Sequence, residues 1–366
     1  MTMENLEGKR IALLLSGGVD SAVAVYKLVS QGLQPDCFYI KIGPEEEEEW
    51  NCTSEEDVEM ATAIAERYGL SFDIVDCHHE YWDKVSRYTI EKVRSGFTPN
   101  PDVMCNRIIK FGAFDEKCGY NYDFIATGHY ADSEFDSQGR KWLCTTPDPV
   151  KDQTDFLAQL YDWQLRKALF PIGKMNKEEV RLVAEREHLV NAHRKDSQGI
   201  CFLGKIDYNE YIRRFLGEQR GDVIDLNSGR KIGEHRGHWF HTIGQRKGLG
   251  FSGGPWFVIR KDINRNVLYV SNGYDPKDAY KSVFYVTDMH LLTPGSVLPD
   301  QVSFKIRHTP DFYFARLTRM DDSVNGMTVW KVESSTPIHG VAPGQFCVIY
   351  DTSHHRCFGS AEITFY

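Results

Sequence analysis

The run Ser16-Gly17-Gly18-Val19-Asp20-Ser21 combines glycines, hydroxyls and a carboxylate as a phosphate-binding loop requires. It follows the apolar run Ile11–Leu15 and precedes a segment with helical periodicity. Glycines without a Cβ let the backbone approach an anion, and the N–H groups at a helix start then face that anion. The alternative interpretation is a tight strand-to-helix turn capped by serines. Position, length and flanking elements favour a phosphate site, in which Asp20 either holds a magnesium ion or shapes the loop.

This loop is neither a Walker A motif nor Gly-x-Gly-x-x-Gly, each of which needs a different glycine spacing. It resembles the signature of the N-type ATP pyrophosphatase (PP-loop) superfamily. That resemblance implies cleavage of ATP between the α- and β-phosphates, with adenylation of a carbonyl-type oxygen.

Cys105 lies in the run TPNPDVMCNR, which is rich in turn-forming residues. Pro99 and Pro101 bias their neighbours away from helix, so an ordered loop is predicted here. Arg107 and Lys110 follow the cysteine, and nearby cations favour the thiolate that sulfur chemistry needs. Taken alone, such a cysteine is more typical of a packing residue.

Cys201 lies in the run RKDSQGICFLG, with Arg194 and Lys195 as cationic neighbours and Gly199 as a flexible point. The other seven of the nine cysteines stand mostly in apolar or strand-like surroundings, which predicts packing roles. No Cys-x-x-Cys pair occurs in the sequence, so neither a disulfide framework nor a zinc knuckle is predicted, and no resident metal site is expected.

Three further runs carry polar residues that suit a binding site. The run 126–130 (ATGHY) follows a predicted strand, so it should share the sheet edge of the glycine loop, although a histidine alone is more often structural. The run 151–154 (KDQT) reads alone as a surface turn. The run 242–250 (TIGQRKGLG) suits either contact with a phosphate backbone or an ordinary basic hairpin turn.

Strands and helices alternate along the first half of the chain. Strands are predicted at 10–15, 35–42, 71–75 and 122–127, and helices at 21–30, 55–68 and 177–188. This alternation predicts an α/β fold with a doubly wound parallel sheet. The resemblance to the PP-loop signature implies that this sheet is of the adenine nucleotide α-hydrolase-like type. Its ligand site should lie at the carboxyl ends of the strands, where the glycine loop falls.

The composition changes in the second half of the chain, where glycines and short runs of β-forming residues dominate. Strands are predicted at 239–243, 256–259, 267–270, 302–306, 312–319, 328–332 and 345–350. Turns such as Asn272-Gly273 and Asn325-Gly326 separate them. We therefore expect three domains: a catalytic domain at 1–206, a small central β-rich domain at 207–276 and a C-terminal β-barrel at 277–366.

Charge is distributed unevenly along the chain, whose formal net charge is −9. Residues 1–204 hold 23 Lys+Arg against 35 Asp+Glu, whereas residues 205–366 hold 20 against 17, a net of +3. Much of the acidity lies in Glu45–Glu49, a run typical of a solvated loop, for which we have no physical role. The average argues weakly against a nucleic-acid partner but leaves room for a local basic groove.

The sequence carries neither a signal pattern at its start nor an apolar run of membrane-spanning length. We expect a cytoplasmic protein that does not associate with membranes, and a monomer. At 366 residues the chain is long enough to bury a substantial core in each of several domains.

Taken together, the runs resemble the bacterial and organellar tRNA-specific 2-thiouridylases (MnmA/TrmU). The matching segments keep the family's order and cover nearly the whole chain: 16–21, 98–111, 126–130, 151–154, 195–204, 244–250 and 343–345. The resemblance implies that ATP adenylates the C2 oxygen of the wobble uridine, which sulfur then replaces. Such a target suits the anticodon loop, because its bases leave their stack more readily than those of a duplex.

The resemblance also implies roles for individual residues. ATP, with Mg²⁺, would be held by Leu14, Leu15, Ser16, Gly17, Gly18, Val19, Asp20, Ser21, Ile40 and Gly128. Cys201 would receive a persulfide from an upstream sulfur carrier protein, and Cys105 would assist sulfur release or form a disulfide with it. Asp102 would act as a general acid/base. Contacts to tRNA would come from Asn100, Pro101, Asp102, His129, Lys151, Asp152, Gln153, Arg307, His308 and Gln345.

Departures from the family pattern are small. Asp155 stands where the family usually has tyrosine, Gln198 replaces a common serine or threonine, and Arg307-His308 is a weak local match. One alternative is another PP-loop ATPase, such as a 4-thiouridine synthase or an amidotransferase-type synthetase; neither explains both cysteines or the β-rich C-terminal third. A catalytically inactive tRNA-binding paralogue is the other alternative, but the loop and both cysteines are present.

Overall fold

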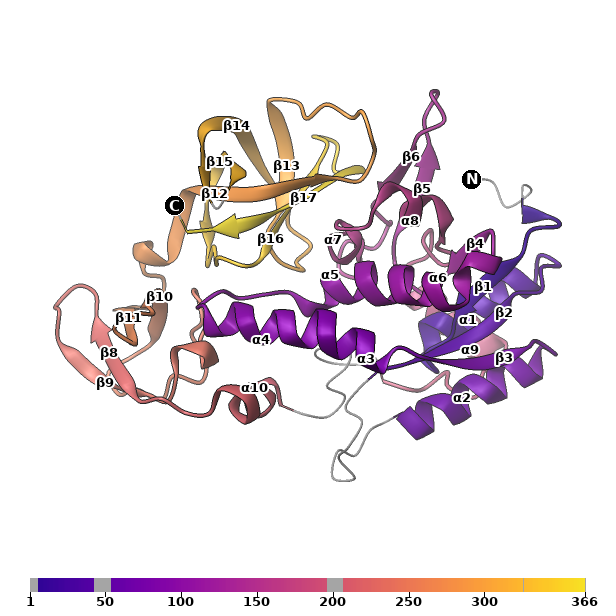
Figure 1. Cartoon of the computed structure of the whole chain (residues 1–366), viewed down its shortest axis with the longest axis horizontal. Coiled ribbons are helices and arrows are strands. Elements are labelled where there is room, and N and C mark those ends of the chain that lie inside the picture. The colour runs from indigo at the N-terminus through magenta and orange to yellow at the C-terminus, as the bar shows by residue number, and fades with distance from the viewer. Residues whose placement is uncertain (1–5, 43–53, 196–206, 325, 366) are drawn as a thin grey trace.

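A computed structural model of the chain describes residues 6–42, 54–195, 207–324 and 326–365. Figure 1 shows a helix-covered sheet on one side, a small β-rich part (β8–β11) on the other, and a barrel above the long helix between them. Cys201 and the rest of the 196–206 run lie outside the described residues, as does the acidic run Glu45–Glu49. Within the described part, no helix is both long and apolar enough to cross a membrane.

The first part contains a five-stranded parallel sheet in the order β3-β2-β1-β4-β7. Its strands are β1 (Ile11–Leu14), β2 (Asp36–Lys41), β3 (Phe72–Asp76), β4 (Phe124–Ala126) and β7 (Ala168–Leu169). Alternate side chains of β1 enter two different cores, because successive residues of a strand point to opposite faces. The prediction of a doubly wound parallel sheet is confirmed.

Helices cover both faces of this sheet. One face packs against α1 (Val19–Val29), α2 (Ser54–Arg67) and α9 (Lys177–Arg186). The other packs against a helical layer made of α3 (His78–Tyr81), α4 (Arg87–Arg94), α5 (Pro101–Cys105), α6 (Phe114–Lys117), α7 (Thr154–Leu157) and α8 (Asp162–Lys167), with π-helical turns at Trp82–Ser86 and Asn106–Ala113. This second layer carries Cys105.

The predicted loop around Pro99 and Pro101 is wrong, because helix α5 begins at Pro101. Proline is accommodated at the first helical position, where its missing N–H costs no hydrogen bond. Asn100 caps the helix, since its side-chain oxygen accepts from Asp102 N at 3.2 Å and Val103 N at 3.4 Å. The helix continues through Cys105 into the π-helical turn, so the cysteine has a rigid support.

The central part joins helix α10 (Tyr208–Leu216) to a four-stranded sheet in the order β10-β11-β8-β9. These strands are β8 (Gly221–Asp225), β9 (Lys231–His235), β10 (Trp256–Asp262) and β11 (Val267–Asn272). The strand predicted at 239–243 is wrong: His238–Phe240 is a 3-10 turn. Trp239 and Phe240 both pack against α4 and α10. In a strand, two consecutive side chains would point to opposite faces and could not share this contact.

Buried histidines make the central part sensitive to acid. Burial is the largest cause that lowers the pKa of His241 to about 4, and the charge of the nearby His235 is the second. Among the described atoms, Nδ1 of His241 has no hydrogen-bond partner. The unfolded chain would bind this proton near pH 6.5, so stability is lost as the pH falls from 6.5 toward 4.

Between pH 7 and pH 5, the free energy of unfolding should therefore fall by about 2 kcal/mol more in the wild type than in His241→Gln, which lacks the titrating imidazole. Calorimetric unfolding at both pH values measures this difference. His193→Gln is the matched control, since the His193 side chain is 89% exposed. Equal losses in all three proteins would contradict the assignment.

The C-terminal part is a closed six-stranded antiparallel barrel in the order β12-β15-β14-β13-β16-β17, with β17 pairing back to β12. Its strands are β12 (Tyr280–Leu291), β13 (Gln301–Lys305), β14 (Tyr313–Val324), β15 (Met327–His339), β16 (Phe346–Tyr350) and β17 (Arg356–Thr364). Inward-facing residues such as Val286, Phe304 and Ile349 fill its core. The predicted barrel is confirmed.

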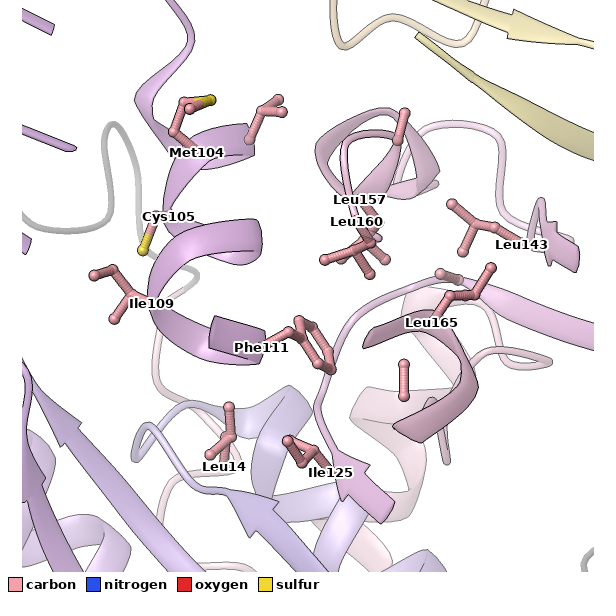
Figure 2. Packing of buried hydrophobic residues seen from close by; sticks show 14 of the residues in the cluster. Leu14, Met104, Cys105, Ile109, Phe111, Ile125, Leu143, Leu157, Leu160 and Leu165 are labelled. Carbon is pink, nitrogen blue, oxygen red and sulfur yellow. The ribbon is translucent and has the colours of Figure 1, made fainter. Parts of the chain in front are cut away.

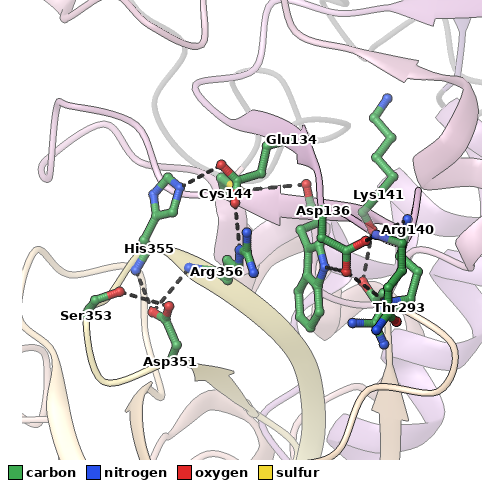
Figure 3. Close-up of polar contacts among 12 residues, drawn as sticks. Glu134, Asp136, Arg140, Lys141, Cys144, Thr293, Asp351, Ser353, His355 and Arg356 are labelled. Carbon is green, nitrogen blue, oxygen red and sulfur yellow. Dashed lines mark hydrogen bonds and ion pairs between the residues drawn. The ribbon is translucent and has the colours of Figure 1, made fainter.

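A hairpin from the first part extends the barrel sheet, which the sequence analysis did not predict. β5 (Asp132–Phe135) pairs with β6 (Lys141–Cys144), and β6 pairs with β17. Figure 3 shows the polar contacts at this junction, where Arg356 Nε donates to Glu134 at 2.6 Å and Thr293 Oγ1 donates to Lys141 O at 2.9 Å. Backbone pairing thus joins the first part of the chain directly to the barrel.

Candidate active site

The glycine loop lies at the carboxyl end of β1, between β2 on one side and β4 on the other. This is the point where the strand order reverses, and ligands of open α/β sheets bind there. Gly17 has φ +74, and a Cβ at this position would lie 2.5 Å from Asp57 O. Only glycine gives the loop this path, because the left-handed backbone and the close contact both exclude a side chain.

The two serines of the loop have different surroundings. Ser21 is buried and donates its hydroxyl to Gly18 O at 3.0 Å, and it also accepts from Ser16 N at 3.3 Å. Ser16 is exposed at the mouth of the loop, with its hydroxyl 3.2 Å from that of Ser21. Ser21 therefore fixes the shape of the loop, and the Ser16 side chain remains accessible to solvent.

Asp20 is engaged by protein groups. Its Oδ1 accepts from Tyr130 Oη at 2.7 Å and from Lys177 Nζ at 2.7 Å, and Oδ2 lies 3.0 Å from the same ammonium. Of the two roles considered for Asp20, these contacts favour shaping the loop. They do not fit a protein ligand for Mg²⁺, because a paired carboxylate would have to release Lys177 first.

The run Ala126–Tyr130 packs against the glycine loop. A Cβ on Gly128 would lie 2.7 Å from Ser21 N and 2.9 Å from Asp20 C, both of them backbone atoms. Tyr130 carries the hydroxyl that holds Asp20. Gly128 thus lets the β4 segment lie directly on the first turn of α1, where phosphate-binding N–H groups are expected.

Two residues that the sequence analysis did not assign to the loop anchor it from outside. Asn191 Nδ2 donates to Gly17 O at 2.8 Å, and Arg194 donates to the same carbonyl at 3.3 Å while pairing with Asp57. Arg194 was considered as a cation near Cys201, yet its described partners belong to the loop and to α2. No sequence pattern indicates this contact, since 174 residues separate Asn191 from Gly17.

We expect Asn191→Ala to raise the KM for ATP about tenfold, because a loop carbonyl loses its buried donor, worth about 1–3 kcal/mol. Steady-state kinetics at varied ATP concentration measures it. Asn209→Ala is the control, because Asn209 is exposed on α10. An unchanged KM in the Asn191 variant would exclude a role in holding the loop.

Cys105 is buried, with 2% of its surface exposed, in the same hydrophobic cluster as Leu14 at the end of β1. Figure 2 shows Cys105 and Ile109 projecting from the same side of their helix, with Leu14 below. Arg107, expected to favour a thiolate here, donates instead to Gln159 Oε1 at 2.8 Å. The thiol therefore shares a packed region with Leu14, which stands two residues before the loop.

The segment before α5 lies where the three parts of the chain meet. Thr98 N donates to Pro343 O of the barrel at 2.7 Å, and the Thr98 hydroxyl lies 3.5 Å from that of Thr242 in the central part. Asn100 and Asp102 follow at the start of the helix, partly exposed, and Pro101 between them is buried. The strip assigned to the target base thus begins at the junction.

Several residues assigned to tRNA contact are buried. Burial lowers the pKa of His129 well below 6.5, and its Nδ1 lies 2.8 Å from the Thr127 hydroxyl. Asp152 accepts from Thr146 N at 2.8 Å and from the Thr154 hydroxyl at 2.5 Å. The interpretation of 151–154 as a surface turn is wrong, because Asp152 and Thr154 belong to the interior and only Lys151 and Gln153 are partly exposed.

Gln153 and Lys305 tie this run to its neighbours. Gln153 Oε1 accepts from Tyr130 N at 2.9 Å, which links the run to the strand edge. Lys305 of the barrel approaches Asp152 at 3.9 Å with both side chains 2% exposed. Among the residues assigned to tRNA, His308 is more accessible than His129 and Asp152, with 39% of its side chain exposed. It pairs with Asp155 at 3.2 Å.

The remaining candidate residues lie in three different places in the structure. Arg246 and Lys247 are exposed in an irregular segment, and no strand is assigned across 242–250, so the described backbone does not form a hairpin there. Ile40 lies at the carboxyl end of β2, next to the loop-bearing strand, as expected for a residue near a nucleotide. Arg307 and Gln345 meet each other, with Nε and Oε1 3.3 Å apart.

One group of side chains in the described residues has metal-ligating atoms close together: Glu134, Cys144 and His355, within 4.8 Å of one another. Glu134 already pairs with Arg356 at 2.6 Å and with His355 at 3.3 Å (Figure 3). Burial raises the pKa of the Cys144 thiol, which disfavours the thiolate that a metal requires. These contacts explain the cluster as an ion-pair network at the hairpin.

Comparisons with known proteins cover almost the entire chain. Residues 9–205 match the tRNA methyl transferase HUP domain, residues 209–272 the tRNA methyl transferase PRC-barrel domain, and residues 281–363 the Aminomethyltransferase beta-barrel domain. The chain is 55% identical over 357 residues to tRNA-specific 2-thiouridylase MnmA 2 of Bacteroides fragilis, covering 96% of this chain and 99% of that protein. It is 54% identical over 358 residues to tRNA-specific 2-thiouridylase MnmA 1 of Bacteroides thetaiotaomicron, covering 97% and 99%.

Proposed function

Because the chain belongs to the family of tRNA-specific 2-thiouridylases, we propose that it is a tRNA sulfurtransferase that thiolates a uridine of tRNA. We further propose that the target is C2 of the wobble uridine, that ATP activates its oxygen, and that a cysteine persulfide supplies the sulfur. The observation that supports this best is that the glycine loop follows β1 at the point where the strand order reverses, and that Leu14, two residues before the loop, shares a hydrophobic cluster with Cys105.

The first step takes place at the glycine loop. The uridine C2 oxygen attacks the α-phosphorus of ATP, pyrophosphate leaves, and the base carries an adenylate at O2. Backbone N–H groups of the loop and the start of α1 suit the phosphates, and Ser16 adds an accessible hydroxyl. Leu14, Ile40 and Gly128 border the space that the nucleotide would take.

Mg²⁺ would enter this step with ATP, where it neutralises charge on the leaving pyrophosphate. Since Asp20 is held by Lys177 and Tyr130, the chain offers the ion a poor carboxylate, and the phosphates and water would supply its ligands. Lys177 itself stays next to the loop and contributes positive charge beside the phosphates.

The second step transfers sulfur. The terminal sulfur of a Cys201 persulfide attacks C2, and AMP leaves with the former O2. Cys105 then attacks the Cys201 sulfur, which releases the thiocarbonyl product and leaves a Cys105–Cys201 disulfide for an external dithiol to reduce. In the alternative route Cys105 first releases hydrosulfide from the persulfide, which then attacks C2. In both routes Asp102 serves as the general acid/base beside the base.

The partners follow from this chemistry. A persulfide-donating sulfur carrier protein must reload Cys201, and the anticodon loop of tRNA must reach the Asn100–Asp102 strip. We propose that the enzyme works as a cytoplasmic monomer, and that it divides into domains at 1–206, 207–276 and 277–366. Of the residues that the resemblance assigns to tRNA, His308 is exposed, and six are partly exposed: Asn100, Asp102, Lys151, Gln153, Arg307 and Gln345.

Incubation of unmodified tRNA with the enzyme, ATP, Mg²⁺ and a persulfide donor tests the proposal. Mass spectrometry of the nucleosides should show 2-thiouridine at the wobble position, with one pyrophosphate released for each thiolation. A product with sulfur at C4, or none with an active donor, would favour another PP-loop enzyme or an inactive tRNA-binding paralogue.

A further inference from the structure

Arg307 lies on the barrel, yet its guanidinium is directed toward other parts of the chain. Its terminal nitrogen donates to Gly340 O at 2.6 Å and to Ile243 O of the central part at 3.2 Å. Its Nε donates to Gln345 Oε1 at 3.3 Å. The guanidinium thus joins a barrel loop to the central part. Its planar group holds several N–H donors in a rigid arrangement, which lysine does not provide.

Two glycines permit this approach. Gly340 has φ +67, and a Cβ there would lie 2.6 Å from the Arg307 guanidinium. Gly244 of the central part has φ +86, and its Cβ would lie 2.7 Å from Gly340 Cα. Two backbone segments from different parts of the chain therefore touch only because neither has a side chain, and Arg307 bonds carbonyls on both sides of that contact.

The same junction holds the segment 94–100, which leads into helix α5. Gly344 would place a Cβ 2.8 Å from Thr98 N, and Pro343 O accepts from that N–H. On the central side, Lys261 Nζ donates to Gly96 O at 3.2 Å. The barrel and the central part thus grip the segment from two sides, only a few residues before Asn100.

We propose that Arg307 is a positioning residue and not a contact to tRNA: it locks the barrel and the central part together so that both hold the segment 94–100. That segment leads directly into helix α5, which carries Asp102 and Cys105. The proposal rests on the proposed function for its catalytic consequence, but the structural part concerns the enzyme without RNA. It gives a role to three glycines whose Cβ atoms would clash at this junction: Gly244, Gly340 and Gly344.

Arg307→Lys separates the two roles, because it keeps the charge and loses the fork. We expect kcat for thiolation to fall about 10- to 100-fold, since misplacement by about 1 Å costs on that order. The affinity for tRNA and its dependence on salt should stay near the wild-type values. Hydrogen exchange of residues 94–100, measured without RNA, should speed up in the variant.

Gly340→Ala tests the junction without changing any charge, and it should reproduce the effects of Arg307→Lys. Gly295→Ala is the matched control, because Gly295 also has positive φ, +72, but its Cβ would meet nothing within 4 Å. This control should keep wild-type kcat and wild-type exchange at 94–100.

A direct contact to a phosphate would give the opposite pattern. Arg307→Lys would then be nearly fully active, and Arg307→Met would weaken tRNA binding and lower the salt slope by about 1. That result, or unchanged exchange at 94–100 in both Arg307→Lys and Gly340→Ala, would overturn the proposal. If the wild type made no 2-thiouridine, the proposed function would fail, while the exchange result would still decide the role of Arg307 at the junction.

Discussion

We expect Cys201→Ser to reduce 2-thiouridine formation to background, at least about 1000-fold, because the residue would be the covalent carrier of the sulfur. A serine hydroxyl cannot hold a persulfide. Pyrophosphate release that depends on tRNA should persist, since the adenylation step uses the glycine loop and not this thiol. Nucleoside mass spectrometry and a pyrophosphate assay on the same sample separate the two steps.

Cys105→Ser should also stop turnover of sulfur transfer and spare adenylation, because the partner thiol is lost. Cys118→Ser is the control: Cys118 is partly exposed at the end of α6, and its thiol bonds only to Phe114 O among the described atoms, at 3.6 Å. Full thiolation by Cys201→Ser would show that sulfur reaches the base by another route.

Gly128→Ala should lower both pyrophosphate release and thiolation, by about 100-fold, since a methyl group would push on the backbone that we propose binds phosphate. The added Cβ would lie 2.7 Å from Ser21 N, closer than side-chain carbons pack in proteins. The atoms that it meets are backbone, so α1 or the β4 segment must shift. The binding of ATP, measured by calorimetry, should weaken in parallel.

Gly139→Ala is the control for this substitution, because Gly139 lies in the β5–β6 turn and its Cβ would meet nothing within 4 Å. Its activity should match that of the wild type. Wild-type ATP binding and pyrophosphate release by Gly128→Ala would remove the Ala126–Tyr130 run from the nucleotide site.

Four strands of the parallel sheet were predictable, because the central ones are short apolar runs between helical segments, whereas β7 has only two residues and was not predicted. β1 and β4 are buried on both faces, so local composition alone distinguishes them from loops. The glycine loop was predictable for a similar reason, since its function depends on local backbone conformation.

Features that depend on contacts distant in sequence were not predictable. Pro101 is a different case, because the missed signal was local: Asn100 at the N-cap and proline at the first helical position mark the start of a helix. The β5–β6 hairpin joins the barrel through pairing with β17, more than 200 residues later in the chain. Asn191 reaches the loop across a comparable separation, and no local pattern identifies it.

The residues assigned to tRNA show where a resemblance needs the structure. Asp152 and His129 match family positions, but in this fold they are buried, and their hydrogen bonds hold the edge of the sheet. Arg307 forms its bonds at the domain junction. A matching sequence position thus indicates that a residue matters to a site, and the contacts indicate how.

We propose that ATP activates the uridine O2 as an adenylate before sulfur replaces it. The most direct measurement uses tRNA carrying ¹⁸O at C2 of the wobble uridine, with ATP, Mg²⁺ and a persulfide donor. Mass spectrometry of the products should find the ¹⁸O in AMP, in a 1:1 ratio with 2-thiouridine. Label in pyrophosphate, inorganic phosphate or water, with unlabelled AMP, would contradict the mechanism.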